Sequence, residues 1–260
     1  MFRQLRILFA ILILLFVSAS VYLTQQRISS WQKPLYVYIY PINADGSQAT
    51  QNYIDRLSDF RFSGISDYMY EQSANYANVT DEPFILSVSP QVDALPPAAP
   101  IGGSVPKVMW WSMKLRFWSW THNTDPRPAP DIQIYVLYYD PQNAQELPHS
   151  IGLARGQIGI VHAFSRNQYN QSNNVVIAHE LMHTVGASDK YNLETDQPIH
   201  PQGYADPNRF PLYPQHRAEL MGGRIPLSRN RSQMPGSLSN TIIGPITASE
   251  IRWDKTPRPE

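Results

Sequence analysis

The sequence predicts an α+β fold, in which a mixed twisted sheet with a histidine-bearing helix precedes an irregular C-terminal region. Three observations lead to this prediction. Strand-like and helix-like runs alternate over about the first 190 residues, and the last 70 or so are irregular and rich in proline. In addition, a long uncharged segment near the N-terminus is typical of one membrane helix ahead of the folded part. Sheet and helices should therefore share one core above a region with little regular structure.

Composition excludes several classes of protein. The 260 residues include 21 basic and 21 acidic side chains, so the formal net charge is zero, and there is no cysteine. A nucleic-acid partner that is bound through its phosphates is not expected at this balance, and neither is a nucleotide. The lack of cysteine excludes disulfides, cysteine-ligated zinc and thiol nucleophiles.

The N-terminus indicates export. Arg3 and Arg6 precede residues 7–23, ILFAILILLFVSASVYL, which are uncharged and at the short end of a membrane-spanning helix. The arginines should stay in the cytoplasm and direct the rest of the chain outward. A signal-anchor is favoured over a signal peptide cleaved near residues 18–20, because the apolar run is longer than a usual signal core. We expect a single-pass protein of the inner or cytoplasmic membrane with an exported domain, or, alternatively, a secreted one.

The folded part should begin after a polar linker at residues 24–34. β-Branched and aromatic runs predict strands at residues 35–42, 84–88, 132–139 and 157–164. Residues 48–78 have an amphipathic helical pattern, with a break expected near Gly64. Residues 108–120, VMWWSMKLRFWSW, are dense in aromatic side chains, which we interpret as core or subdomain packing.

A helix over residues 174–186, NVVIAHELMHTVG, has an apolar face at helical spacing. Asn173 or Asn174 is expected to cap its N-terminus, and Gly186 suits the position where it stops. Near the C-terminus, Thr247 and Glu250 have the spacing of a capping box, which predicts one more short helix.

This helix contains the residues that can bind a metal ion. His179 and His183 are four residues apart and therefore lie on one helical face, where both imidazoles can reach a single ion. Glu180 is on a neighbouring part of that face and is placed to contact a metal-bound water rather than the ion.

Two later features strengthen the metal prediction. Gly186 can turn the chain back so that Asp189 becomes a third ligand. Met221 stands in ELMGG, where glycines permit a tight turn. Glu219, in the same segment, remains an alternative third ligand.

The motif HELMHTVGASD resembles the metzincin pattern of zinc metalloproteases in its aspartate form, and is similar to snapalysin-type and to uncharacterised bacterial metzincin-like proteins. The resemblance implies Zn²⁺ bound by His179, His183 and Asp189, with Glu180 as general base and Met221 in the Met-turn. It further implies an endopeptidase acting on protein or peptide substrates. Residues 35–186 would form the upper subdomain and residues 187–260 the lower one.

One departure concerns the tyrosine that several metzincins carry two residues after this methionine, because Gly223 occupies that position here. Tyr191 and His162 are the remaining candidates for contact with substrate or transition state. His162 belongs to residues 157–164, which we expect to be an edge strand that pairs with extended substrate.

Two other functions remain open at this point. A gluzincin-type metallopeptidase would use Glu219 as the third ligand. A catalytically inactive, membrane-tethered module would keep the zinc helix for stability only.

Overall fold

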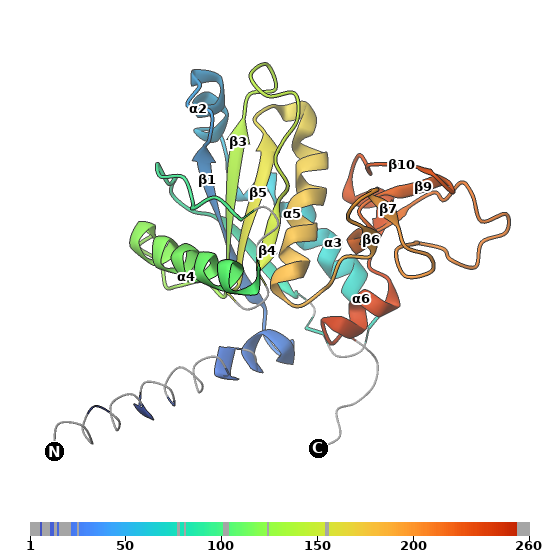
Figure 1. Ribbon diagram of the computed structural model, residues 1–260, viewed down its shortest axis with the longest axis horizontal. Coiled ribbons are helices and arrows are strands. Elements are labelled where there is room, and N and C mark those ends of the chain that lie inside the picture. Colours follow the sequence, from blue (N-terminus) through green and yellow to red (C-terminus); the bar gives the residue numbers. More distant parts are fainter. Residues whose placement is uncertain are drawn as a thin grey trace.

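The computed structural model describes residues 6, 11, 12, 15, 22–24, 26–76, 79, 80, 82–100, 104–123, 125–153 and 156–253. Its centre is a five-stranded mixed sheet of order β2-β1-β3-β5-β4. Figure 1 shows helices on both faces of this sheet and an irregular C-terminal region beside helix α5. The coarse α+β prediction is thus confirmed.

The four longer strands lie close to their predicted positions. They are β1 (Leu35–Asn43), β2 (Phe84–Val88), β3 (Ile132–Tyr139) and β5 (Ile158–Phe164). All pair in parallel, with registers such as Val37 beside Ile132 and Ile134 beside Gly159. Strands buried on both faces read as continuous apolar runs, which is why these segments were recognisable.

The edge of the sheet differs from the prediction. Residues 157–164 were expected at the edge, but β5 is paired on both sides. The edge strand is β4 (Ile151–Leu153), which runs antiparallel to β5 with Ile151 beside Ile160. A run of three residues carries too little pattern to predict a strand.

Two cores fill the faces of the sheet. One face packs on α3 (Ser63–Ser73) and α5 (Asn170–Thr184) through residues such as Ile39, Met69 and Leu181. The opposite face packs on α4 (Val105–His122), which contributes Trp111 and Leu115. The aromatic-rich segment at residues 108–120 is therefore only partly core, because most of its large apolar side chains are exposed.

The helical region after β1 breaks earlier than predicted. It comprises α2 (Gln48–Ile54), a short 3-10 turn (Asp59–Arg61) and then α3, so that Gly64 lies inside the first turn of α3. Ser47 caps α2 by accepting a hydrogen bond from the Thr50 amide. This cap, and not the glycine, marks a helix boundary here.

Helix α5 starts at Asn170, so the predicted cap at Asn173 or Asn174 is wrong. The Asn173 side chain instead bonds both backbone groups of Phe164, accepting from its amide and donating to its carbonyl. The other end agrees with the prediction, because Gly186 follows the helix with φ of 110°. An asparagine near a helix start can thus clamp a strand, which local sequence does not reveal.

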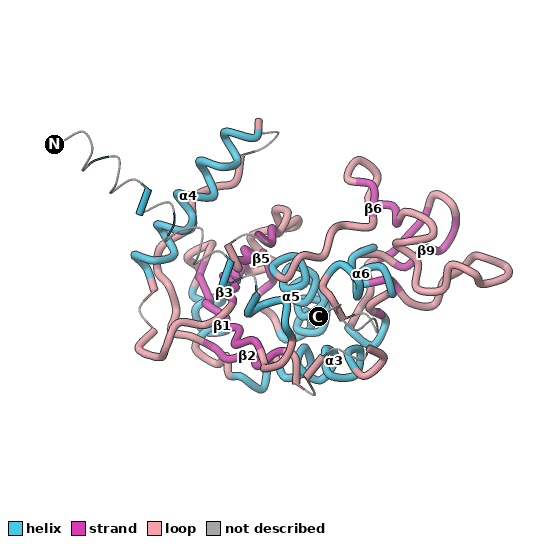
Figure 2. Tube along the Cα trace, turned by 90° about the horizontal axis from the view of Figure 1, so that it is seen from below, coloured by secondary structure: helices cyan, strands magenta, loops and turns pink. Residues whose placement is uncertain are grey.

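The C-terminal region is built from short pieces. The sheet fragments are β6 (Tyr191–Asn192) with β7 (Gln197–Pro198), β8 (Ala218–Glu219) with β11 (Thr241–Ile242), and β9 (Ile225–Ser228) with β10 (Arg231–Gln233). Two 3-10 turns, Leu220–Gly222 and Leu238–Asn240, and helix α6 (Pro245–Glu250) complete it. Figure 2 shows it as mostly loop.

Helix α6 does not use the predicted capping box. Gly244 occupies the N-cap position, and Thr247 and Glu250 are inside the helix. The Thr247 hydroxyl donates to Glu219, while Glu250 binds Lys190. Both side chains therefore serve tertiary contacts.

Residues 24–34 are not a free linker. Residues 26–30 are helical, and Ile28 and Trp31 are each only 2% exposed. The Trp31 indole donates to the Ile251 carbonyl and packs edge-on against Trp253. The start of the domain is thereby joined to its end.

The predicted membrane segment, residues 7–23, falls mostly outside the described residues. Among the residues that are described, no helix is long and apolar enough to cross a membrane.

Candidate metal centre

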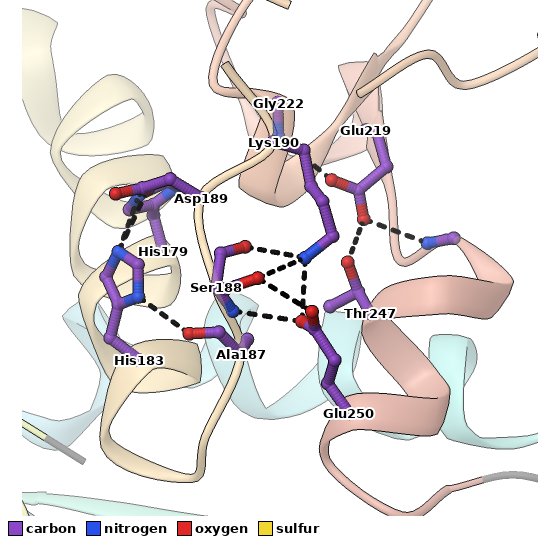
Figure 3. A network of polar contacts seen from close by, with 11 residues as sticks. His179, His183, Ala187, Ser188, Asp189, Lys190, Glu219, Gly222, Thr247 and Glu250 are labelled. Atoms are coloured by element: carbon purple, nitrogen blue, oxygen red, sulfur yellow. Dashed lines mark hydrogen bonds and ion pairs between the residues drawn. The ribbon is translucent and has the colours of Figure 1, made fainter. Parts of the chain in front are cut away.

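Three side chains from two elements meet at one point. His179 and His183 project from α5, and Asp189 follows the turn made by Gly186 (Figure 3). The Nε2 atoms of the histidines are 3.2 Å apart, and each is 3.1 Å from Oδ1 of Asp189. Among the described residues this is the group of histidine and acidic side chains placed to hold a metal ion.

The other imidazole nitrogens fix the direction of the lone pairs. Nδ1 of His179 is 2.9 Å from the Leu220 carbonyl, and Nδ1 of His183 is 2.9 Å from the Ala187 carbonyl. A carbonyl oxygen only accepts, so both Nδ1 atoms carry the proton. When both rings are neutral, the Nε2 lone pairs therefore point towards each other and towards the Asp189 carboxylate. These groups repel one another unless a cation lies between them.

These donors fit zinc. Two imidazole nitrogens and one carboxylate are a usual three-residue set for a zinc ion that keeps a fourth position open. Ligands at the usual Zn–N and Zn–O bond lengths in a tetrahedron are separated by about 3.3 Å, close to the 3.1–3.2 Å measured here. Zinc-binding histidines typically donate their other ring N–H to a carboxylate, a water or a backbone carbonyl, and here both Nδ1 atoms contact backbone carbonyls.

The charges around the site favour a cation. Burial alone would lower the pKa of His179, but the hydrogen bond to Asp189, the charge of Glu180 and the Leu220 carbonyl raise it to about 9. Burial opposes ionisation of Asp189, yet hydrogen bonds from His179 and His183 hold its pKa well below the usual range. The negative charges that hold a proton on His179 would also attract a dication.

Glu180 lies next to the three ligands without belonging to them. Its side chain is buried, and burial raises the pKa of its carboxyl, an effect that the neighbouring histidines partly offset. Its Oε2 has no hydrogen-bond partner among the described residues. A buried carboxylate oxygen without a partner is costly, and such a group is a candidate for proton transfer.

A cleft of about 260 Å³ opens beside these residues. His179 and Glu180 line it, together with side chains from β5 and from the C-terminal region. Both predicted contact residues, His162 and Tyr191, are in its wall. The structure thus brings every predicted site residue except Met221 to this cleft or to the ligand triangle.

The two contact candidates are both electrically neutral near pH 7. Burial lowers the pKa of His162 to about 4, and its Nδ1 is 2.9 Å from the Tyr139 hydroxyl. Burial, together with the charges of Asp189, Glu180 and Asp196, raises the pKa of Tyr191. Because its pKa is raised, the Tyr191 phenol keeps its proton near pH 7 and can donate a hydrogen bond. Its ring lies 6.1 Å from the His179 ring, close to the three candidate ligands.

Glu219 is not placed to bind the ion with these ligands. It is 1% exposed, and its Oε2 accepts from the Gly222 amide at 2.9 Å. Its Oε1 accepts from the Gly244 amide and from the Thr247 hydroxyl, at 3.1 and 2.7 Å. Burial raises the pKa of this carboxyl. Both oxygens are therefore engaged in joining the turn after β8 to α6, as Figure 3 shows.

Met221 is fully buried in a tight turn whose first residue contacts His179. The turn, Leu220–Gly222, supplies the carbonyl that His179 contacts, and the carbonyl of Met221 accepts from the Lys190 amide at 2.8 Å. Gly223 follows with φ of 70°, which a glycine adopts without strain. The turn thus supports one ligand and the loop that carries another.

One contact that positions the Asp189 loop has no signal in the sequence. Lys190, adjacent to Asp189, is buried, and its Nζ donates to Glu250 at 2.7 Å and to the carbonyl and hydroxyl of Ser188 (Figure 3). This network holds the Asp189 loop against α6. Lys190 and Glu250 are 60 residues apart, so no local pattern links them.

Comparison with known proteins gives little. No protein-family model matches the chain, and a search of curated proteins finds no match. Among solved structures, one described as a chaperone–substrate complex is similar with 11% identity and a TM-score of 0.37. The match covers 86% of this chain and 35% of that one, so this chain spans about a third of its length.

Proposed function

We propose that this protein is a zinc-dependent endopeptidase of metzincin-like type. The observation that carries the proposal is the triangle of His179, His183 and Asp189. The Nδ1–H groups of the two histidines are fixed by backbone carbonyls, and the buried carboxylate of Glu180 lies beside the triangle. The resemblance of HELMHTVGASD to the metzincin pattern supports the same conclusion.

His179, His183 and Asp189 would hold the ion. When bound, zinc lowers the pKa of water and polarises a carbonyl, which are the two requirements of amide hydrolysis. Glu180 takes the proton from the attacking water and passes it to the leaving amine, a task suited to a carboxyl whose pKa is raised by burial. Tyr191 remains protonated at neutral pH and can donate a hydrogen bond to the developing oxyanion.

The substrate is a protein or peptide in extended form. Strand β4 has one edge unpaired among the described residues, and its Gly152 abuts the α5 backbone at Glu180. A peptide that adds to this edge would pass the catalytic carboxylate. The proposal moves substrate pairing from β5, which is paired on both sides, to β4.

The proposed location is the exported side of a membrane to which residues 7–23 attach the chain. Their composition supports this, as do the two arginines that precede them. Cleavage of this segment, which would release the domain, is the alternative.

The test is hydrolysis of a peptide mixture by the purified chain, with and without a zinc chelator, and by Glu180→Gln. We expect cleavage that the chelator abolishes and zinc restores. Glu180→Gln should keep bound zinc and lose about 10²–10⁴-fold in rate, because only the proton carrier is removed.

Two outcomes would decide against the proposal. Cleavage at the wild-type rate by Glu180→Gln would exclude the mechanism. A chain that binds zinc tightly but cleaves no peptide would be the inactive zinc-binding module instead.

A further inference from the structure

Helix α4 exposes an apolar surface on the side away from the sheet. Trp111 and Leu115 are buried against the sheet, at 4% and 0% exposure. Besides Val105 at the start of the helix, five large apolar side chains of α4 are each more than half exposed, namely Met109, Trp110, Met113, Phe117 and Trp120. We define these five as the α4 patch. A soluble helix normally has one apolar face, and this one has two.

The α4 patch is continuous along the helix. At 100° per residue its five side chains fall within an arc of about 100°, opposite the buried face. The helix of 18 residues is about 27 Å long. Exposed apolar surfaces of this kind mark a site of interaction rather than ordinary solvent-facing residues.

The charges on α4 identify the kind of partner. The helix has three basic residues, Lys107, Lys114 and Arg116, and no acidic one, although the whole chain has no net charge. Lys107 and Lys114 are exposed and border the patch on the helical wheel. Tryptophans with flanking lysines are typical of helices that lie in the headgroup region of an anionic bilayer.

The start of the chain would bring α4 to such a surface. The apolar run ends at Leu23, and Ile28 and Trp31 are already buried in the domain. Only a few residues thus separate a membrane segment from a fixed point on the fold. In Figure 1, residues 26–30 and α4 both lie towards the lower end of the sheet.

We propose that α4 is a membrane-surface helix, which inserts the α4 patch between lipids while Lys107 and Lys114 contact lipid phosphates. Because α4 and α5 cover opposite faces of the sheet, this contact leaves the cleft open. The inference does not depend on the proposed peptidase activity. A second copy of the chain, or a protein partner, would be the other occupant of such a surface.

The test uses tryptophan fluorescence of the full chain reconstituted in vesicles of phosphatidylcholine and phosphatidylglycerol whose acyl chains are brominated. Bromine quenches only tryptophans in contact with lipid. We expect loss of about a third of the emission, the share of Trp110 and Trp120 among the six tryptophans. Trp110→Phe/Trp120→Phe should abolish the quenching, and Trp111→Phe, on the buried face, should not.

The same assay tests the proposed contact between the lysine side chains and anionic lipid. Vesicles of phosphatidylcholine alone should quench less, and Lys107→Gln/Lys114→Gln should remove the difference between the two lipid mixtures. Equal quenching of wild type and Trp110→Phe/Trp120→Phe, or none in either, would overturn the proposal. Absence of quenching together with cross-linking through α4 would assign the α4 patch to a second copy.

Discussion

The side chains of the site are oriented by contacts with the surrounding chain as well as by contacts with one another. His179 and His183 each place Nδ1 on a carbonyl, from Leu220 and Ala187, so their ring orientations are set before any ion binds. Asp189 is held through its neighbour Lys190, whose amide donates to Met221 and whose Nζ binds Glu250. This preorganisation is what a zinc site with an open position requires.

Tyr191 has the proposed role of donating a hydrogen bond to the developing oxyanion. Tyr191→Phe removes the hydroxyl group and keeps the ring that packs beside Gly223. We expect the turnover number to fall about 10²–10³-fold, because a hydrogen-bond donor to the oxyanion is lost, and the zinc content to stay unchanged. Steady-state kinetics and zinc analysis of the same preparation check this; a variant with wild-type turnover would show that Tyr191 only packs.

Among the site residues, the sequence predicted the proximity of those that are close together in the chain. His179, Glu180 and His183 lie on one helix, and the Gly186 turn returns the chain to Asp189, so their proximity follows from local geometry. Lys190 with Glu250, and Asn173 with Phe164, are contacts between segments or through a side chain with several possible partners. Local patterns contain no information about them.

At the scale of the elements, strand β4 and helix α5 approach each other closely. A Cβ at Gly152 would lie 2.5 Å from the Glu180 carbonyl oxygen and 2.5 Å from the Cβ of His183. Strand β4 can lie this close to α5 only because this position is glycine. The proposed catalytic residues and the proposed substrate-binding edge therefore adjoin at this contact.

Gly152→Ala should therefore displace α5 from β4. We expect a loss of about 1–3 kcal/mol in the free energy of unfolding, as for overpacked cores, with reduced peptide cleavage. Urea denaturation measures the first quantity. Gly64→Ala is the matched control, because a Cβ there meets nothing within 4 Å and a helix gains from alanine. Equal stability of Gly152→Ala and wild type would mean that the contact is not tight.

Element prediction succeeded where a strand is long and buried on both faces, as in β1 and β3. It failed at β4, which is too short for a pattern, and at residues 24–34, whose Ile28 and Trp31 are isolated apolar residues in a polar segment. In α4 the aromatic density was interpreted as core or subdomain packing, which holds for Trp111 but not for the exposed Trp110 and Trp120. Its second apolar face became visible only when the sheet was seen to cover just one side.

For the whole molecule, the ion pair of Lys190 and Glu250 joins the Asp189 loop to the last helix. Burial opposes ionisation of Glu250, but hydrogen bonds from Lys190 and Ser188 prevail and lower its pKa below the ordinary 4.5. A lowered pKa stabilises the folded state above the unfolded-state value, and this stability is lost as the pH falls through the folded-state value.

We therefore expect Glu250→Gln to be less stable than wild type near neutral pH and to approach it as the pH falls below about 4.5. Urea unfolding at a series of pH values measures the difference. Glu71→Gln, at an exposed glutamate of α3, is the control. A difference between wild type and Glu250→Gln that stays constant with pH would contradict the assignment.

The central claim, that His179, His183 and Asp189 form a zinc centre, is tested most directly by zinc bound per chain in wild type, Asp189→Ala and Glu219→Gln. We predict one zinc in wild type and in Glu219→Gln, and affinity weaker by more than about a hundredfold in Asp189→Ala. Circular dichroism verifies that each variant is folded. Unchanged zinc binding in Asp189→Ala, with loss of zinc in a folded Glu219→Gln, would contradict the claim and assign the third ligand to Glu219.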